Sequence, residues 1–175
     1  MPTDYYHTYI TPEGFDDIIL RSDGTALTGL YFAHHHDRNT HSSSEAELPV
    51  FRDTRLWLDI YFSGKQPDFT PAYRIDNLTP FRQRVQQIMQ SIPFGQMMTY
   101  GEIAKAIDDC TDSAAKMSAQ AVGGAVGWNP ICIIVPCHRV IGARGQLVGY
   151  GGGINNKINL LGLEGHSISK SLIVT

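Results

Sequence analysis

Residues 99–127, TYGEIAKAIDDCTDSAAKMSAQAVGGAVG, contain the pattern that predicts the architecture of the C-terminal half of the chain. Thr99, followed three residues later by Glu102, is a capping-box signature, so a helix is expected to begin directly after Thr99. Either Ser113 or Ser118 can cap a second helix, which is lined with alanine and glycine. Two short helices about ten residues apart, the second with small side chains, are typical of a helix-turn-helix whose second helix approaches another backbone closely.

The rest of the chain supplies the elements around this motif. Thr79 is followed by proline, which predicts the start of another helix because proline is favoured at the first helical position. Residues 15–33 contain two β-branched and aromatic runs joined by Ser-Asp-Gly, a hairpin signal, and the apolar spacing of residues 49–62 predicts a helix. We therefore expect a two-domain α/β (α+β) protein. A small N-terminal β-sheet with a helix would span 1–78, and a mainly helical, winged-helix-like helix-turn-helix domain would span 79–175.

Composition excludes several classes of protein. The longest aliphatic run, at residues 131–135, is far shorter than the roughly 18 residues that a membrane helix needs. The N-terminus lacks a basic segment followed by an apolar stretch, so no signal peptide is expected. The three cysteines are an odd number without C-x-x-C spacing, which excludes a disulfide framework and favours a reducing compartment. We expect a cytoplasmic protein with no membrane partner.

The net charge hides an asymmetry between the two halves of the chain. Residues 1–78 carry 6 Lys and Arg against 12 Asp and Glu, whereas residues 79–175 carry 8 against 5. The resulting charges of −6 and +3 add to the total of −3. The two halves therefore point to different partners.

Cys137 is the strongest candidate for chemistry. It follows the apolar run 131–135, which is expected to form a buried strand, and side chains at such a position are held rigidly. Buried cysteines are more often inert than nucleophilic. Adjacent side chains point in divergent directions, so His138 would take the cysteine proton through a bridging water. Glu164 can orient the imidazole, although a carboxylate at the end of an apolar segment is more often a solvated helix-end charge.

The run Pro136-Cys137-His138-Arg139-Val140 resembles the acceptor-site signature of the O6-alkylguanine-DNA alkyltransferases, also called methylated-DNA–protein-cysteine methyltransferases. The resemblance covers residues 79–166, because further motifs occur in the family's order and at about its spacing. The N-terminal half resembles the family only through its length and its hairpin-then-helix pattern. The further motifs are Pro93-Phe94-Gly95 with Thr99-Tyr100, Ala121-Val122-Gly123-Gly124, Asn129-Pro130, Gly149-Tyr150 with Gly152-Gly153, and Leu160-Leu161 with Glu164-Gly165.

The resemblance implies direct-reversal DNA repair. An O6-alkylguanine would be flipped out of duplex DNA and its alkyl group transferred irreversibly to Cys137, with O4-alkylthymine as a further candidate substrate. His138 would accept the thiol proton through water, and Glu164 would orient His138. Asn129 would brace the loop, and Tyr100 would give a proton toward the departing guanine. The thioether product cannot be cleaved here, so the protein should act once, as a monomer, without a cofactor or a metal.

The resemblance also implies a base pocket and a DNA-binding surface. Tyr150 would stack near the base, the amide of Gly151 would donate to O6, and Gly152 belongs to a glycine loop that leaves room for a planar base. The carbonyls of Cys137 and Val140 would accept the exocyclic amine of guanine. Pro136 would fix the approach to the site, and the remaining expected DNA contacts are Gln120, Ala121, Gly123 and Arg139. A structural role is the alternative for Arg139, which lies inside the acceptor-site signature.

The sequence departs from the family pattern at Gln120, where the family commonly has an arginine that fills the gap left by the flipped base. Glutamine offers neither charge nor a large stacking plane, so weaker DNA affinity is expected. Trp128 can pack or lie against DNA. Some members of the family bind zinc through N-terminal cysteine and histidine, but no cysteine precedes Cys110 here, so that site is not expected. Two groups of polar residues have more than one possible role. A metal could bind to, or water could solvate, the side chains of His34, His35, His36, Asp37 and His41. Phosphate contacts and a solvated face are both open for Lys157, Arg144 and Lys105.

Two other functions remain open from the sequence. A non-catalytic module could recognise alkylated DNA and recruit repair factors, although such relatives lack the acceptor cysteine. A cysteine hydrolase could use Cys137, His138 and Glu164 on a small ester or peptide, but it would need an oxyanion hole that the sequence does not clearly show.

Overall fold

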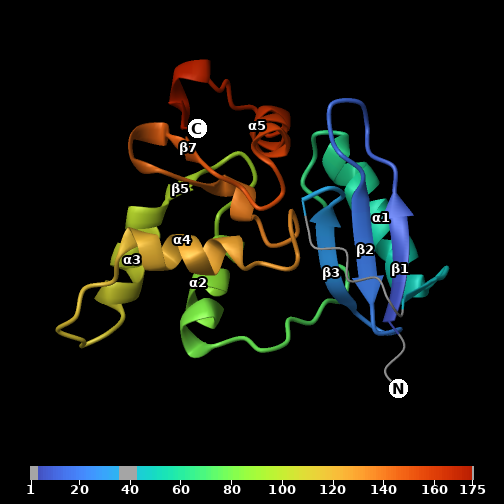
Figure 1. Cartoon of the computed structure of the whole chain (residues 1–175), viewed down its shortest axis with the longest axis horizontal. Helices are drawn as coiled ribbons and strands as arrows, with labels where there is room; N and C mark the ends of the chain where they lie inside the picture. Colours follow the sequence, from blue (N-terminus) through green and yellow to red (C-terminus); the bar gives the residue numbers. More distant parts are fainter. Residues whose placement is uncertain (1–3, 36–42, 175) are drawn as a thin grey trace. The chain divides into compact units, whose positions relative to one another are not determined.

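The computed structural model describes residues 4–35 and 43–174, and these fold into two compact units (Figure 1). The first unit comprises Met1–Asp76 together with Pro130–Ile134. The second comprises Asn77–Asn129 and Val135–Thr175. A single domain boundary at residue 78 does not describe this division fully, because the short segment Pro130–Ile134 of the C-terminal half belongs to the N-terminal unit. In the described part of the chain, no helix is both long enough and apolar enough to cross a membrane.

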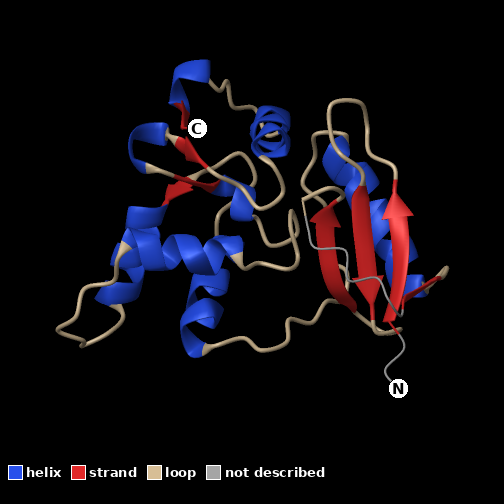
Figure 2. Ribbon diagram, in the orientation of Figure 1, coloured by secondary structure: helices blue, strands red, loops and turns tan. Residues whose placement is uncertain are grey.

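The first unit is a four-stranded sheet covered on one face by a helix (Figure 2). The strand order is β3-β2-β1-β4: β1 (Asp4–Tyr9) pairs antiparallel with β2 (Ile18–Ser22), which pairs antiparallel with β3 (Leu27–Phe32). The short β4 (Ser43–Glu45) runs parallel to β1. Helix α1 (Pro49–Phe62) has the predicted bounds and begins with proline. The predicted hairpin is β2 and β3, so that expectation is confirmed.

Aromatic side chains join α1 to the sheet. The Tyr9 hydroxyl of β1 donates a 2.7 Å hydrogen bond to Asp59, and the rings of Tyr9 and Phe62 stack with centroids 6.0 Å apart. Trp57 and Tyr61 stack on each other at 5.4 Å on the buried face of the helix. The apolar spacing that predicted this helix is thus the spacing of its buried face.

The outer edge of β3 is paired by two segments that are not strands of the sheet. Near its start, the Leu27 amide donates to the carbonyl of Ala72 at 2.8 Å, and the Arg74 amide donates to the carbonyl of Leu27 at 2.8 Å. Further along, the Leu30 amide donates to the carbonyl of Pro130, and the Cys132 amide to the carbonyl of Leu30, both at 2.9 Å. These pairs satisfy backbone groups that an open edge would leave to solvent.

The strand predicted over residues 131–135 is wrong. Only Ile131 forms a bridge to β3, and the chain then turns, with Ile133 in the left-handed region at φ 68°. The side chains of Ile131, Ile133 and Val135 are buried. The apolar run is therefore a sign that these residues are buried. A short apolar run does not by itself show that a buried segment is a strand.

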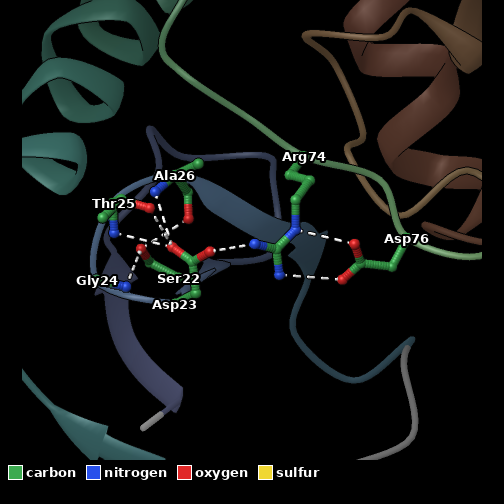
Figure 3. Close-up of polar contacts among 7 residues, drawn as sticks. All are labelled: Ser22, Asp23, Gly24, Thr25, Ala26, Arg74 and Asp76. Carbon is green, nitrogen blue, oxygen red and sulfur yellow. Dashed lines mark hydrogen bonds and ion pairs between the residues drawn. The ribbon is translucent and has the colours of Figure 1, made fainter. Parts of the chain in front are cut away.

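The linker that leaves the first unit is held by Arg74 (Figure 3). The guanidinium donates to Asp23 of the β2–β3 turn at 2.6 Å and to both oxygens of Asp76 at 2.9 and 3.1 Å. The other oxygen of Asp23 accepts from the amides of Thr25 and Ala26. These backbone hydrogen bonds, with the Thr25 hydroxyl and the charge of Arg74, lower the pKa of Asp23 to about 2. Because the ion pairs are exposed, their role is to orient the linker rather than to stabilise the unit strongly.

Three capped helices form the first part of the second unit. Helix α2 (Pro80–Gln90) begins after Thr79, whose hydroxyl accepts from the Arg82 amide. Strand β5 (Met98–Thr99) leads into α3 (Tyr100–Asp109), where both halves of the predicted capping box are present. Helix α4 (Ala119–Gly127) is capped by Ser118, which decides between the two predicted serines. The three helices pack together, as the helix-turn-helix prediction requires.

The second part of this unit carries short elements around one further helix. Strand β6 pairs parallel with β5, and β7 pairs parallel with β8. Ile141, Leu147 and Leu161 form a buried cluster beneath them. The fold class is confirmed as a small sheet with a helix followed by a mainly helical unit. The elements after α4 are η1 (Cys137–Arg139), β6 (Val140–Ile141), η2 (Ala143–Gly145), β7 (Leu147–Val148), α5 (Ile154–Leu163), η3 (Lys170–Leu172) and β8 (Ile173–Val174).

Candidate active site

Cys137 lies at the first position of the 3-10 helix η1 and is buried. Its amide donates to the carbonyl of Val135 at 2.8 Å, and its own carbonyl accepts from the Val140 amide. The preceding Pro136 has φ fixed by its ring and opens this tight turn. The thiol Sγ lies 3.6 Å from the hydroxyl of Tyr150. The backbone on both sides thus fixes the position of the sulfur.

His138 and Glu164 form a buried pair beside the cysteine. The imidazole Nε2 and Glu164 Oε1 are 2.7 Å apart, and neither side chain is exposed to solvent. Glu164 is the C-cap of α5, so the end of that helix presents the carboxylate to η1. The contact of Nε2 with the carboxylate fixes the orientation of the imidazole ring.

Glu164 is also bound by Arg139 and by a backbone amide. The guanidinium Nε donates to Oε2 at 2.9 Å and Nη2 donates to Oε1 at 2.9 Å, while the Gly95 amide donates to Oε2 at 3.1 Å. Burial alone raises the pKa of Glu164, but the hydrogen bonds from His138 and Arg139 outweigh it and hold that pKa well below its ordinary value. Burial lowers the pKa of His138, against the opposing effect of Glu164. The pair is therefore a carboxylate with a neutral imidazole, which can accept a proton.

Lys157 of α5 brings a positive charge to the same site. Its side chain is fully buried, and Nζ donates to the Val140 carbonyl at 2.6 Å. Nζ lies 6.0 Å from the ring centroid of Tyr100 and 5.7 Å from that of Tyr150. Burial lowers the pKa of Lys157 to about 8, and the charge of Cys137 opposes this shift. Lys157 is thus a buried cation close enough to Cys137 for their charges to interact.

Comparison with known proteins shows the family of the chain. The family described as 6-O-methylguanine DNA methyltransferase, DNA binding domain, matches residues 80–166. The methylated-DNA–protein-cysteine methyltransferase of Mycobacterium leprae is 44% identical over 159 residues, which cover 89% of this chain and 90% of that protein. The chain belongs to the methylated-DNA–protein-cysteine methyltransferase family. The Haemophilus influenzae protein of the same name is 38% identical, covering 91% of this chain and 86% of that one.

Solved structures extend the similarity to the fold. A crystal structure of Mycobacterium tuberculosis OGT in complex with DNA superposes with a TM-score of 0.77 at 39% identity, covering 91% of this chain and 92% of that one. The sequence matches and the superposition both include the N-terminal unit, so the similarity is not confined to residues 79–166.

The structure buries two cations, Arg139 and Lys157, and for Arg139 it favours the structural alternative over the DNA contact. Arg139 was expected at the DNA, but it is buried and its guanidinium is engaged by Glu164 and by the Ile92 carbonyl at 2.8 Å. Lys157 was open as a phosphate contact, but it is buried beside the acceptor. The burial of Lys157 could have been predicted from the sequence of α5. Leu160 and Leu161 follow it by three and four residues, which places all three on the same buried face of the helix.

The remaining predicted site residues lie around Cys137 or on α4. Asn129 Nδ2 donates to the Val135 carbonyl at 2.9 Å, two residues before the acceptor. Tyr100 begins α3, and its pKa is raised by burial and then by the charge of Cys137. Gly149 and Gly153 have φ values of 44° and 88°, which bend the glycine loop around Tyr150.

The same loop holds the glycines expected at the base pocket. Gly151 is exposed, whereas Gly152 is buried and its carbonyl accepts from Asn156 Nδ2 at 2.7 Å. This hydrogen bond ties the loop to the first turn of α5. The loop is thus anchored at Gly152, while Gly151 is exposed.

Helix α4 offers an exposed face of small residues. Gln120 and Ala121 are exposed at its start, and Gly123 faces the Tyr100 ring, where an added Cβ would lie 3.9 Å from ring carbons. Trp128, at the end of the helix, carries the Arg82 guanidinium 4.1 Å from its ring centroid. Trp128 therefore makes a packing contact within its own unit.

The candidate metal ligands of the N-terminal half do not assemble in the described residues. His35 Nε2 lies 2.9 Å from Asp16, which accounts for one of the histidines, and His36, Asp37 and His41 lie outside the described residues. Across 4–35 and 43–174, no group of three or more histidine, cysteine or acidic side chains is arranged to hold a metal.

Proposed function

We propose that this chain repairs alkylated DNA by transferring the alkyl group of an O6-alkylguanine to Cys137. The observation that carries the proposal is the hydrogen-bonded pair of His138 and Glu164 beside a buried cysteine, in a chain of the methylated-DNA–protein-cysteine methyltransferase family. Duplex DNA is the proposed partner, and the similar M. tuberculosis OGT structure is a complex with DNA. The first unit would support the second, and the second would hold the DNA and accept the alkyl group.

The proposed reaction is a displacement at the alkyl carbon. The Cys137 thiol proton passes through a water molecule to His138 Nδ1, and Glu164 stabilises the imidazolium that forms. The thiolate attacks the alkyl carbon, an S–C bond forms, and the bond between that carbon and O6 breaks with its electrons going to guanine. Tyr100 then gives a proton to the departing base. The product is a thioether and an unmodified guanine.

The geometry supports a flipped base as substrate. A base inside the duplex cannot reach a buried thiol, so the nucleotide must leave the stack. The exposed start of α4, with Gln120 and Ala121, is the proposed contact with the minor groove. Tyr150 and the amide of Gly151 are the proposed contacts with the extruded base, and the carbonyls of Cys137 and Val140 would accept its exocyclic amine.

The protein should therefore gain one alkyl group per molecule. Intact-protein mass spectrometry after incubation with duplex DNA carrying one O6-methylguanine should show a single gain of about 14 Da that maps to Cys137. Undamaged duplex is the substrate control. Cys137→Ser should gain nothing, while Cys132→Ser, which removes the other buried cysteine, should still be methylated.

Two outcomes would replace this proposal. Tight binding to the damaged duplex without a mass gain would indicate a recognition module. Neither gain nor binding, together with repeated turnover of a small ester, would indicate a hydrolase.

A further inference from the structure

Arg139 is held at both ends of its guanidinium. Nε and Nη2 meet the two oxygens of Glu164 in a side-on pair, each at 2.9 Å, and Nη1 donates to the Ile92 carbonyl at 2.8 Å. The group also lies 5.8 Å from the ring centroid of Phe94. Because the planar guanidinium is itself hydrogen-bonded on two sides, it restricts the orientation of the Glu164 carboxylate that it binds. Arg139 thus determines where the oxygens of Glu164 lie.

The ion pair between Arg139 and Glu164 also affects His138. Oε1 of Glu164, which contacts the imidazole at 2.7 Å, is also the oxygen that accepts from Arg139 Nη2. A carboxylate whose charge is balanced by a guanidinium attracts an added proton on its other neighbour less strongly than a free carboxylate does. The charge of Arg139 therefore opposes protonation of His138, both through Glu164 and directly.

We propose that Arg139 is a positioning residue for alkyl transfer: it fixes the Glu164 carboxylate against His138 and keeps the imidazole neutral, ready to accept the thiol proton. The inference rests on the proposed function, because it assigns a role within the same proton relay. It also explains why a buried arginine directly follows the histidine, where a hydrophobic residue would avoid the desolvation of a guanidinium.

The charged groups around His138 all come from the same unit. Glu164 and Lys157 approach from α5, and Arg139 adjoins the histidine in η1. Glu164 favours the imidazolium, whereas Arg139 and Lys157 oppose it, as burial does. Removal of Arg139 leaves Glu164 as an unbalanced anion beside the ring, so the imidazolium becomes easier to form from solvent protons. At low pH the site then loses its proton acceptor before it meets DNA.

The test compares Arg139→Gln and Arg139→Lys with the unaltered protein. The rate of alkyl transfer from an O6-methylguanine duplex is measured between pH 5.5 and 9, and the titration of His138 is followed by NMR of the labelled ring. In Arg139→Gln, both the acid limb of the rate and the His138 titration should move upward by about one pH unit. The rate loss should be about tenfold at pH 6 and should shrink toward pH 9. Arg139→Lys retains the charge without the planar guanidinium and should move both midpoints by less than half as much.

A purely structural role makes a different prediction. It would reduce the rate by the same factor at every pH and leave the His138 titration in place, and either result would overturn the proposal. Arg52→Gln, an exposed arginine of α1, is the control for removal of one positive charge. If Arg139→Gln does not fold, Arg139→Lys decides: a loss that is larger at pH 6 than at pH 9 supports the role, and an equal loss refutes it.

Failure of the proposed function would be recognised separately. If the unaltered protein gains no methyl group, alkyl transfer is excluded, yet the His138 titration of the resting protein still reports whether Arg139 keeps the ring neutral. An unchanged titration in a protein that does transfer the methyl group would instead overturn only the role of Arg139.

Discussion

Replacement of Lys157 by methionine should remove a pH dependence of stability that this buried lysine imposes. Burial lowers the pKa of Lys157 from 10.5 to about 8, so the folded protein binds the lysine proton less tightly than the unfolded chain. At 1.36 kcal/mol per unit, this difference is a cost of about 3 kcal/mol at pH values below 8. Between about pH 8 and 10.5 the unfolded chain holds a proton that the folded protein has lost, so the free energy of unfolding rises with pH in that window.

The expected effect of Lys157→Met at neutral pH is small, because two changes oppose each other. The variant avoids the cost of burying the ammonium, but the Val140 carbonyl loses its 2.6 Å hydrogen bond, which costs about 1–3 kcal/mol. At pH 10 the folded protein no longer buries an ammonium, so only the loss of the hydrogen bond to the Val140 carbonyl distinguishes the variant. Relative to the variant, the unaltered protein should therefore gain about 3 kcal/mol between pH 7 and pH 10.

Urea unfolding at pH 7 and pH 10 measures this difference. Both proteins carry Cys137→Ser in this measurement, because the charge of Cys137 acts on Lys157. Lys105→Met, which removes an exposed lysine of α3, is the matched control and should follow the unaltered protein at both pH values. Equal changes in the free energy of unfolding for Lys157→Met and the unaltered protein would refute a depressed pKa at this site. The alkyl-transfer rate of Lys157→Met at pH 7 should fall by about tenfold or more, since the thiolate loses a nearby cation.

Three further changes have defined outcomes. Gln120→Arg should tighten binding to duplex DNA and steepen its dependence on salt by about one unit of slope, and an unchanged slope would place Gln120 away from the phosphates. Tyr100→Phe should slow single-turnover transfer by about tenfold or more with DNA affinity, measured by fluorescence anisotropy, unchanged; an unaltered rate would exclude Tyr100 as the proton donor. Thr99→Ala should lower the free energy of unfolding by about 1 kcal/mol in urea titrations, because α3 loses its capping box, and a loss near zero would mean that the cap is dispensable.

Local signals in the sequence predicted most of the helices. A helix over 49–62 followed from apolar spacing, and Thr99 with Glu102 marked the start of α3, since a cap depends only on residues three positions apart. Strand β1 escaped prediction because its sequence, DYYHTY, alternates weakly and is only half-buried along most of its length. Its place in the sheet is set by pairing with β2 and β4.

The placement of buried charges could not be predicted from local sequence. Arg139 and Glu164 are 25 residues apart, and only the fold brings the end of α5 against η1. An arginine or lysine on its own indicates a solvated or phosphate-binding group, because such residues are seldom buried without a partner. The family resemblance therefore grouped Cys137, His138 and Glu164, whereas the burial of Lys157 and the pairing of Arg139 with Glu164 appear only in the fold.

The edge of β3 has a consequence for how the chain is made. The sheet of the first unit is completed at Leu30 by Pro130 and Cys132, which leave the ribosome only after α2, α3 and α4 have been synthesised. Until then the Leu30 amide and carbonyl lack these partners, and the nascent sheet presents an open strand to other chains. A fragment that stops before Pro130 should keep that open strand permanently. It should therefore tend to self-associate, and a peptide that supplies residues 128–136 should suppress this association.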